Sequence, residues 1–428
     1  MNREIVLEAT LGITVGLIVA AIAAFRSKPV PGAGTFRRAA MLGILTYAVI
    51  AAPTFTPPGM SVLGMIALLV VVGLALAGSL LAPQLVAPQP VAQRGVQGLV
   101  GTGVAAILLI AAGQTLALLS RLDPRVIVVV VAVTAALLVA GQGLVASSRI
   151  SSVAMWLLIV PILIALALGF LLGNVSVLAS PSRIGDGTPW VAILAVALLI
   201  FALGWVDNSL LAGRRAGKWS PLRVLVWVVV VLVLVLVGLL MFFGGVMFAP
   251  SMEFFVVPAN IDALPGLAGV LLAIVTVLFA ALVANALTGV GGLGLDTQPQ
   301  SSPAEASSSG AVADSTVAAE PNVTVRPIWV WGSAAVAVIV ALIDPGSQAI
   351  LIAVGLLAAA LVGAQVGGGD AARGAITGLV ATLVGVVVLV VIGRLELGWA
   401  SIIVTFAVAL VGFLVGRFGP NQARSATT

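Results

Sequence analysis

The sequence predicts an all-α, polytopic integral membrane protein, and three observations lead to this prediction. Of the 428 residues, 61% are hydrophobic and only 8% are charged, with a mean hydropathy of +1.28. Soluble domains are roughly 45–50% apolar and about 25% charged, because they need a polar surface. The apolar residues also gather in runs of about 20, the length that an α-helix needs to cross a bilayer. These runs are apolar on all sides, whereas strands of a membrane barrel alternate over about ten residues.

About thirteen runs meet this length criterion, with a range of twelve to fourteen, since proline or aspartate shortens the second and the tenth. In chain order, the runs lie near 5–25, 39–56, 60–82, 96–119, 126–146, 153–173, 190–206, 224–244, 266–289, 328–343, 347–366, 375–393 and 398–416.

The runs divide the chain into units separated by one polar segment. Residues 294–326 contain "LDTQPQSSPAEASSSGAVADSTVAAEPNVTV", which has too few large apolar side chains to fold. We predict a disordered cytoplasmic linker there. The remaining units are the first helix at 1–25, helices 2–5 at 26–152, helices 6–9 at 153–293, a four-helix unit at 327–418 and a cytoplasmic tail at 419–428.

The cations predict how the chain is oriented. Placing the loop that contains Arg26 and Arg38 in the cytoplasm puts fourteen of the nineteen Lys and Arg residues on that side. Cytoplasmic loops carry such an excess of cations. We therefore predict the inner (plasma) membrane, with the N-terminus outside and the C-terminus inside. A cytoplasmic cluster is expected to contact anionic lipid headgroups; it consists of Arg214, Arg215, Lys218 and Arg223.

Two residue types are missing from the chain, and their absence excludes several classes of catalytic and metal site. The chain has no histidine and no cysteine, which excludes imidazole and thiolate catalysis, the metal sites built from these groups and the usual haem ligands. We expect no enzymatic activity, no metal and no cofactor. The cations are scattered over short loops rather than gathered on one face with aromatic residues, so nucleic-acid binding is not expected either.

Four polar side chains inside the predicted helices are the candidates for a polar path: Glu8, Tyr47, Gln114 and Asn285. Glu8 is expected about one turn inside the first helix, where the helix N-terminus and outer headgroups favour an anion. Such residues either line a path for a polar solute or form hydrogen bonds between helices, and the second role is the more common one.

Small residues at four-residue spacing predict close helix packing. The motif "GITVG" occupies 12–16, and Gly355, Ala359 and Gly363 form a longer stripe. Because small side chains let helices approach closely, we expect these helices to pack on protein rather than on lipid.

Two segments of similar sequence suggest an internal repeat. The segment "QRGVQGLVGTGVAAILLI" at 93–110 is similar to "ARGAITGLVATLVGVVVLV" at 372–390. This similarity would pair helices 2–5 with helices 10–13 as four-helix repeats of the same orientation.

One loop resembles a known transporter family. The segment "DNSLLAGRRAGKW" at 207–219 resembles the first cytoplasmic loop of sodium–solute symporters, where an Asp, an apolar pair and Ala-Gly-Arg recur before a Trp. About thirteen helices also suit that family. Here, however, the loop lies far from the N-terminus, and a Val and Leu run replaces the Ser-, Thr- and Gly-rich helix around the family's ion path. The resemblance therefore assigns no ion-site residue.

The sequence favours a transporter or permease-like protein for a small or amphipathic solute. One alternative is a non-catalytic structural subunit of a larger complex, with a membrane protein partner or a second copy covering an apolar face. A lipid-active enzyme ranks last, because its available acids, Asp186 and Asp262, are ordinary turn residues.

Overall fold

The computed structural model describes six helical stretches and several short pieces of the chain. The stretches are 3–25, 91–120, 122–141, 267–291, 326–344 and 347–366; the pieces are 150, 153–154, 157, 194, 198–199, 201–203, 205, 380, 384 and 402–407. All secondary structure in these residues is α-helical, as predicted.

The observed helices begin and end close to the predicted runs. They are α1 (Arg3–Phe25), α5 (Val91–Ser120), the helix Pro124–Gly141, α9 (Leu267–Gly291), α10 (Pro327–Ile343) and α11 (Ser347–Val366). The tenth run, which proline and aspartate bound, does form a helix. Pro327 lies in its first turn, where proline costs no hydrogen bond. Asp344 ends the helix in the left-handed conformation, with φ 46°, and its N–H donates to the Val340 carbonyl at 3.1 Å.

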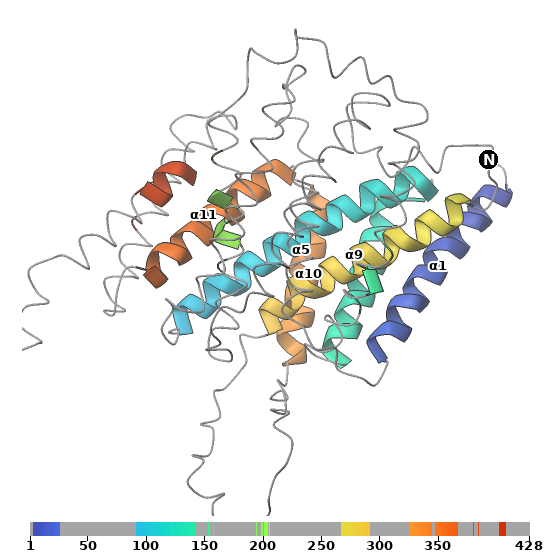
Figure 1. Cartoon of the computed structure of the whole chain (residues 1–428), viewed down its shortest axis with the longest axis horizontal. Helices are drawn as coiled ribbons and strands as arrows, with labels where there is room; N and C mark the ends of the chain where they lie inside the picture. Colours follow the sequence, from blue (N-terminus) through green and yellow to red (C-terminus); the bar gives the residue numbers. More distant parts are fainter. Residues whose placement is uncertain are drawn as a thin grey trace, which may run out of the picture.

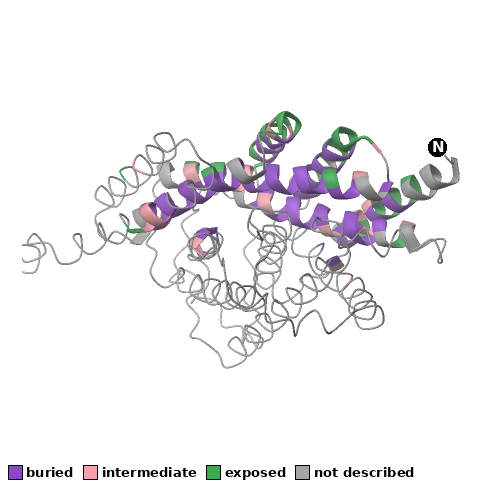
Figure 2. Cartoon of the chain, turned by 90° about the horizontal axis from the view of Figure 1, so that it is seen from above, coloured by how far each residue is buried: buried purple, intermediate pink, exposed green. Residues whose placement is uncertain are grey.

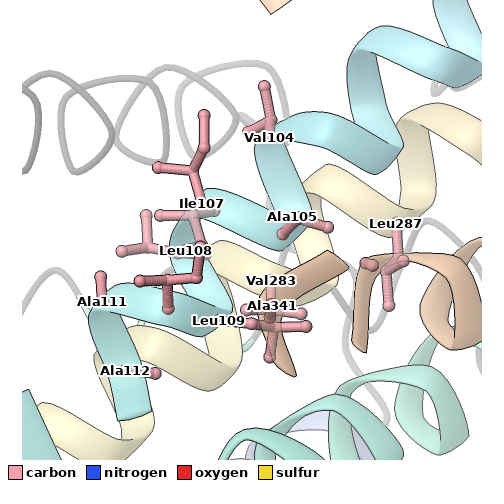
Figure 3. Packing of buried hydrophobic residues seen from close by; sticks show 14 of the residues in the cluster. Val104, Ala105, Ile107, Leu108, Leu109, Ala111, Ala112, Val283, Leu287 and Ala341 are labelled. Carbon is pink, nitrogen blue, oxygen red and sulfur yellow. The ribbon is translucent and has the colours of Figure 1, made fainter. Parts of the chain in front are cut away.

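Helix α5 lies at the centre of the described structure (Figure 1). It packs against α9, α10 and α11, and α9 in turn packs against α1 and α10. Every residue from Val104 to Gly113 is buried, and Leu108 and Leu109 are fully enclosed (Figure 3). A helix that is apolar on all sides becomes buried on all sides when other helices surround it.

The short pieces that contain Leu199 and Ile402 pack against α11, whereas those that contain Ile150 and Ala154 pack in a cluster with α1 and α9. The Phe201 ring lies 5.6 Å from the Trp205 ring and 6.1 Å from the Phe406 ring, measured between ring centroids. A methyl group added at Gly355 would lie 2.7 Å from Leu199 and 3.2 Å from Ile402. The predicted small-residue stripe on this helix therefore packs on protein at Gly355.

Helices α10 and Pro124–Gly141 lie on the same side of the α5–α9 pair, and both have exposed outer faces (Figures 1 and 2). On Pro124–Gly141 the exposed large side chains after Arg125 are all apolar: Val126, Val129, Val130, Val133 and Leu137. Within the described residues, Gly95–Ala117 and Pro124–Gly141 are long and apolar enough to cross a membrane.

The closest backbone approach joins α1 to α9. A methyl group at Gly12 would lie 2.6 Å from the Gly269 carbonyl oxygen, and one at Gly16 would lie 2.7 Å from the Ala273 carbonyl oxygen. Since real side chains do not come this close to backbone atoms, only glycine fits at the two positions. The prediction that the "GITVG" motif packs on protein is confirmed, with α9 as the partner.

We predict that Gly16→Ala destabilises the protein, because the added methyl group pushes α1 away from the backbone of α9. Overpacking of this kind costs about 1–3 kcal/mol. The measurement is thermal unfolding of the purified protein in lipid nanodiscs. Gly332→Ala is the matched control, since nothing lies within 4 Å of its added methyl group. Equal unfolding temperatures for the two variants would show that the α1–α9 approach contributes nothing to stability.

Candidate functional site

The buried polar side chains of the described residues are all uncharged. They are Gln97, Thr115, Ser120, Thr276, Asn285, Thr288, Ser333 and Thr405. The described part of the chain contains no group of three or more acidic, histidine or cysteine residues that could hold a metal ion. What the described interior offers a solute is therefore hydroxyl and amide groups.

Several of these hydroxyls are satisfied within their own helices. Thr276 donates to the Leu272 carbonyl at 2.8 Å, and Thr288 donates to the Asn285 carbonyl at 2.7 Å. Ser and Thr commonly bond to a carbonyl one turn earlier in this way. Because each hydroxyl has one proton, Thr276 and Thr288 can offer a solute only acceptor lone pairs.

One hydroxyl pair joins two helices. The Thr102 Oγ1 on α5 lies 2.7 Å from the Ser333 Oγ on α10, and it also donates to the Gly98 carbonyl at 2.8 Å. Since the single proton of Thr102 goes to Gly98, Ser333 must donate to Thr102. The sequence did not single out this pair, because a Thr or Ser in an apolar helix gives no sign of whether it bonds its own helix or a neighbour.

The structure separates the two sequence candidates whose side chains it describes. Asn285 on α9 is only 7% exposed, and its backbone carbonyl accepts a hydrogen bond from Thr288 of the same helix. Gln114 on α5 is exposed. The two amides therefore do not share one enclosed space.

Gln114 is a single exposed residue in an otherwise largely buried stretch of α5. From Val100 to Ala117, it is the one exposed residue of α5, and both of its neighbours, Gly113 and Thr115, are buried. A primary amide carries two donors and an acceptor, which lose hydrogen bonds when they face hydrocarbon. Its exposure makes Gln114 the candidate among these residues for contact with water or a polar solute.

The other sequence candidates lie wholly or partly outside the described residues. Glu8 lies in α1, but its side chain is outside the described part. Tyr47 lies outside the described residues, as does the predicted lipid-contacting cluster of Arg214, Arg215, Lys218 and Arg223. The linker, the symporter-like loop at 207–219 and most of the second repeat segment are also outside them.

We predict that Thr102→Val and Ser333→Ala are coupled when their effects on unfolding free energy are compared in a double-mutant cycle. Hydrogen bonds between membrane helices have coupling energies of about 0.6 kcal/mol on average and about 1.7 kcal/mol at most. The control cycle pairs Ser333→Ala with Thr134→Val, whose hydroxyl bonds the Val130 carbonyl of its own helix. Coupling in the control but not in the Thr102 cycle would contradict the assigned bond.

Comparison with known proteins establishes the fold class. No protein family matches the chain, and no curated protein matches it in sequence. Among solved structures, the chain is similar to a Na+-coupled sialic acid symporter in a substrate-bound, outward-open state, with 13% identity, a TM-score of 0.58 and coverage of 97% of both chains.

A manganese transporter from Eremococcus coleocola also matches, with 14% identity over 97% of this chain and 88% of that one. Its TM-score of 0.38 is too low to support an argument. The likeness to the symporter shows a shared fold: this chain is an all-helical protein that crosses the membrane several times. The number of crossings and the orientation stay predictions.

Proposed function

We propose that the protein is a secondary transporter, a permease-like carrier for a small or amphipathic solute. The observation that carries this proposal is the likeness to the sialic acid symporter over 97% of both chains. A likeness of this extent includes the whole helical framework rather than one shared motif. The resemblance of residues 207–219 to a loop of sodium–solute symporters supports the same function from the sequence side.

The composition supports transport over catalysis. A chain without histidine and cysteine lacks the side chains that most often act as nucleophile or general base near neutral pH. Carrying an uncharged or amphipathic solute needs only hydrogen-bonding groups along a path. Of the two sequence candidates whose side chains are described, the exposed Gln114 is the one that we propose supplies such a group, whereas we propose a structural role for the buried Asn285.

We also propose where the protein lies in the cell and how it is oriented. The chain lies in the inner membrane with its N-terminus outside, since this orientation puts fourteen of the nineteen cations on the cytoplasmic side. The helix α5 then runs from the cytoplasmic side, near Val91, to the outer side, near Ser120. Gln114 is six residues from the outer end of that helix, which places it in the outer half of the membrane.

Transport is tested in proteoliposomes that contain the purified protein. An inward Na+ gradient is applied, and uptake is measured for labelled sialic acid, followed by small sugars, amino acids and amphipathic amines. We expect at least one solute to accumulate above the level of protein-free liposomes. If the carrier is coupled to Na+, uptake falls to that level when the gradient is collapsed.

We further predict that Gln114→Cys reacts with a small, charged thiol reagent, because an exposed amide at this position is expected to face water rather than hydrocarbon. The chain contains no cysteine, so the new thiol is the only target. Two matched controls are Asn285→Cys, which is buried, and Leu137→Cys, which is 56% exposed on an apolar face. We expect neither control to react with the charged reagent, and Leu137→Cys to react with a lipid-soluble one.

A non-catalytic structural subunit is the second candidate, favoured by the exposed apolar faces of α10 and Pro124–Gly141. The two functions predict different labelling of Gln114→Cys, and this experiment can be done without knowing the solute. If Gln114→Cys is as unreactive as Asn285→Cys and no solute accumulates, the transport proposal fails and the structural subunit becomes the better interpretation.

A further inference from the structure

Helix α10 has two faces of opposite character. The buried face consists of Val330, Ser333, Ala334, Ala337 and Ala341, four of which are small. The exposed face carries large apolar side chains at helical spacing, namely Ile328, Val336, Ile339 and Ile343, with Gly332 and Ala335 between them. In membrane proteins small residues face other helices, because they allow close approach. The large residues therefore mark the face that other helices do not cover.

The exposed face is too apolar for water. Ile328 is 77% exposed and Ile343 is 70% exposed, although they lie at opposite ends of the helix. A continuous apolar stripe of this length on a soluble surface would indicate a binding site or a tendency to aggregate. In a protein with a membrane fold, the hydrocarbon of the bilayer is the solvent that suits it.

The dimensions and the charges of α10 suit a bilayer. Arg326 and Asp344, both exposed, bracket the helix, and eighteen residue steps at 1.5 Å place them about 27 Å apart along its axis. The hydrocarbon core of a bilayer is about 30 Å thick. One charged residue therefore reaches each membrane surface while the apolar stripe stays between them.

The end of α10 near Arg326 combines a cation with exposed aromatic rings. Trp329 is 50% exposed and Trp331 is 39% exposed, both within the first turns of the helix. Tryptophan is enriched at the level of the headgroups, where its ring lies in the apolar region and its N–H reaches polar groups. A guanidinium beside these rings attracts the phosphate of a lipid headgroup. An anionic lipid is expected to bind more tightly than a zwitterionic one, because the zwitterionic headgroup neutralises its phosphate with its own cation.

We propose that the outer face of α10 contacts lipid directly, and that Arg326, Trp329 and Trp331 form a site for an anionic phospholipid at one end of that face. The occupant is a bilayer lipid, with its phosphate at Arg326 and its acyl chains along Ile328, Val336 and Ile339. The site depends on the membrane fold and not on the proposed transport activity, so either proposal can fail alone.

Contact with lipid is tested by fluorescence quenching in nanodiscs made with phospholipids brominated near the headgroup. The chain has eight tryptophans, so the wild type is compared with the double variant Trp329→Phe, Trp331→Phe. We expect the variant to lose a strongly quenched component of the emission. Equal quenching of the two proteins would overturn the lipid contact of these rings.

Selectivity for anionic lipid is tested by measuring which lipids stay bound after extraction from mixed phosphatidylglycerol and phosphatidylcholine bilayers. We expect Arg326→Gln to lower the retained phosphatidylglycerol, and the control Arg125→Gln to leave it unchanged. Arg125 is also exposed at the start of a helix, but its described neighbours include no tryptophan. An equal effect, or no effect, of the two substitutions would overturn the anionic site.

A second copy of the chain is the competing occupant, and Ile339→Cys tests for it. The new thiol is the only one in the chain and lies 56% exposed at the middle of the stripe. Under mild oxidation in the membrane we expect no disulfide-linked dimer. Efficient dimer formation, together with unquenched Trp329 and Trp331, would assign this face to protein and overturn the proposal.

Discussion

The described structure depends on the close approach of helices at glycine. Inside a bilayer, apolar side chains gain nothing by leaving lipid for protein, so helices associate through tight van der Waals packing and hydrogen bonds. Here Gly12 and Gly16 bring α1 onto the backbone of α9, and at Gly103 an added methyl group would collide with Val354 of α11. The helix that follows α5 approaches it closely at Gly113, where an added methyl group would lie 2.8 Å from Val128. The burial of Val104–Gly113 on all sides follows from these contacts, because neighbours can surround a helix only where its surface lets them approach.

This packing determines how the polar groups are used. Once α5 is enclosed, each polar side chain on it must find a partner among nearby groups or lie at an opening. Thr102 finds two such partners: the Gly98 carbonyl on its own helix and the Ser333 hydroxyl on α10. Gln114 is instead exposed, although Gly113 and Thr115 beside it are buried. This contrast is the physical reason for proposing a solute contact at Gln114 rather than at the Thr102–Ser333 pair, whose hydroxyls bond each other.

The fold was more predictable from sequence than the site was. Helix positions follow from runs of apolar residues, since a run of about 20 has one stable form in lipid, and α10 shows that even a run bounded by Pro327 and Asp344 forms as expected. The "GITVG" motif predicted close packing but not its partner, because the spacing of two glycines does not specify which helix they meet. Gln114 and Asn285 look alike in sequence, as single amides in apolar runs. Their different environments arise from helix packing, which is set by residues far away in the chain.

The α1–α9 contact also limits the conformational changes that the proposed transport could use. At Gly12 and Gly16 the contact is between backbones, so sliding α1 by one residue along α9 would bring larger side chains, such as Ile13 and Leu17, into the space that accepts only a hydrogen atom. Packed interfaces of this kind have discrete arrangements and do not deform continuously. A conformational change of the kind that the proposed transport needs is therefore expected to keep α1 and α9 together and to move other parts of the chain against them. We expect the two helices to move as one, because Gly12 and Gly16 leave no room for a methyl group.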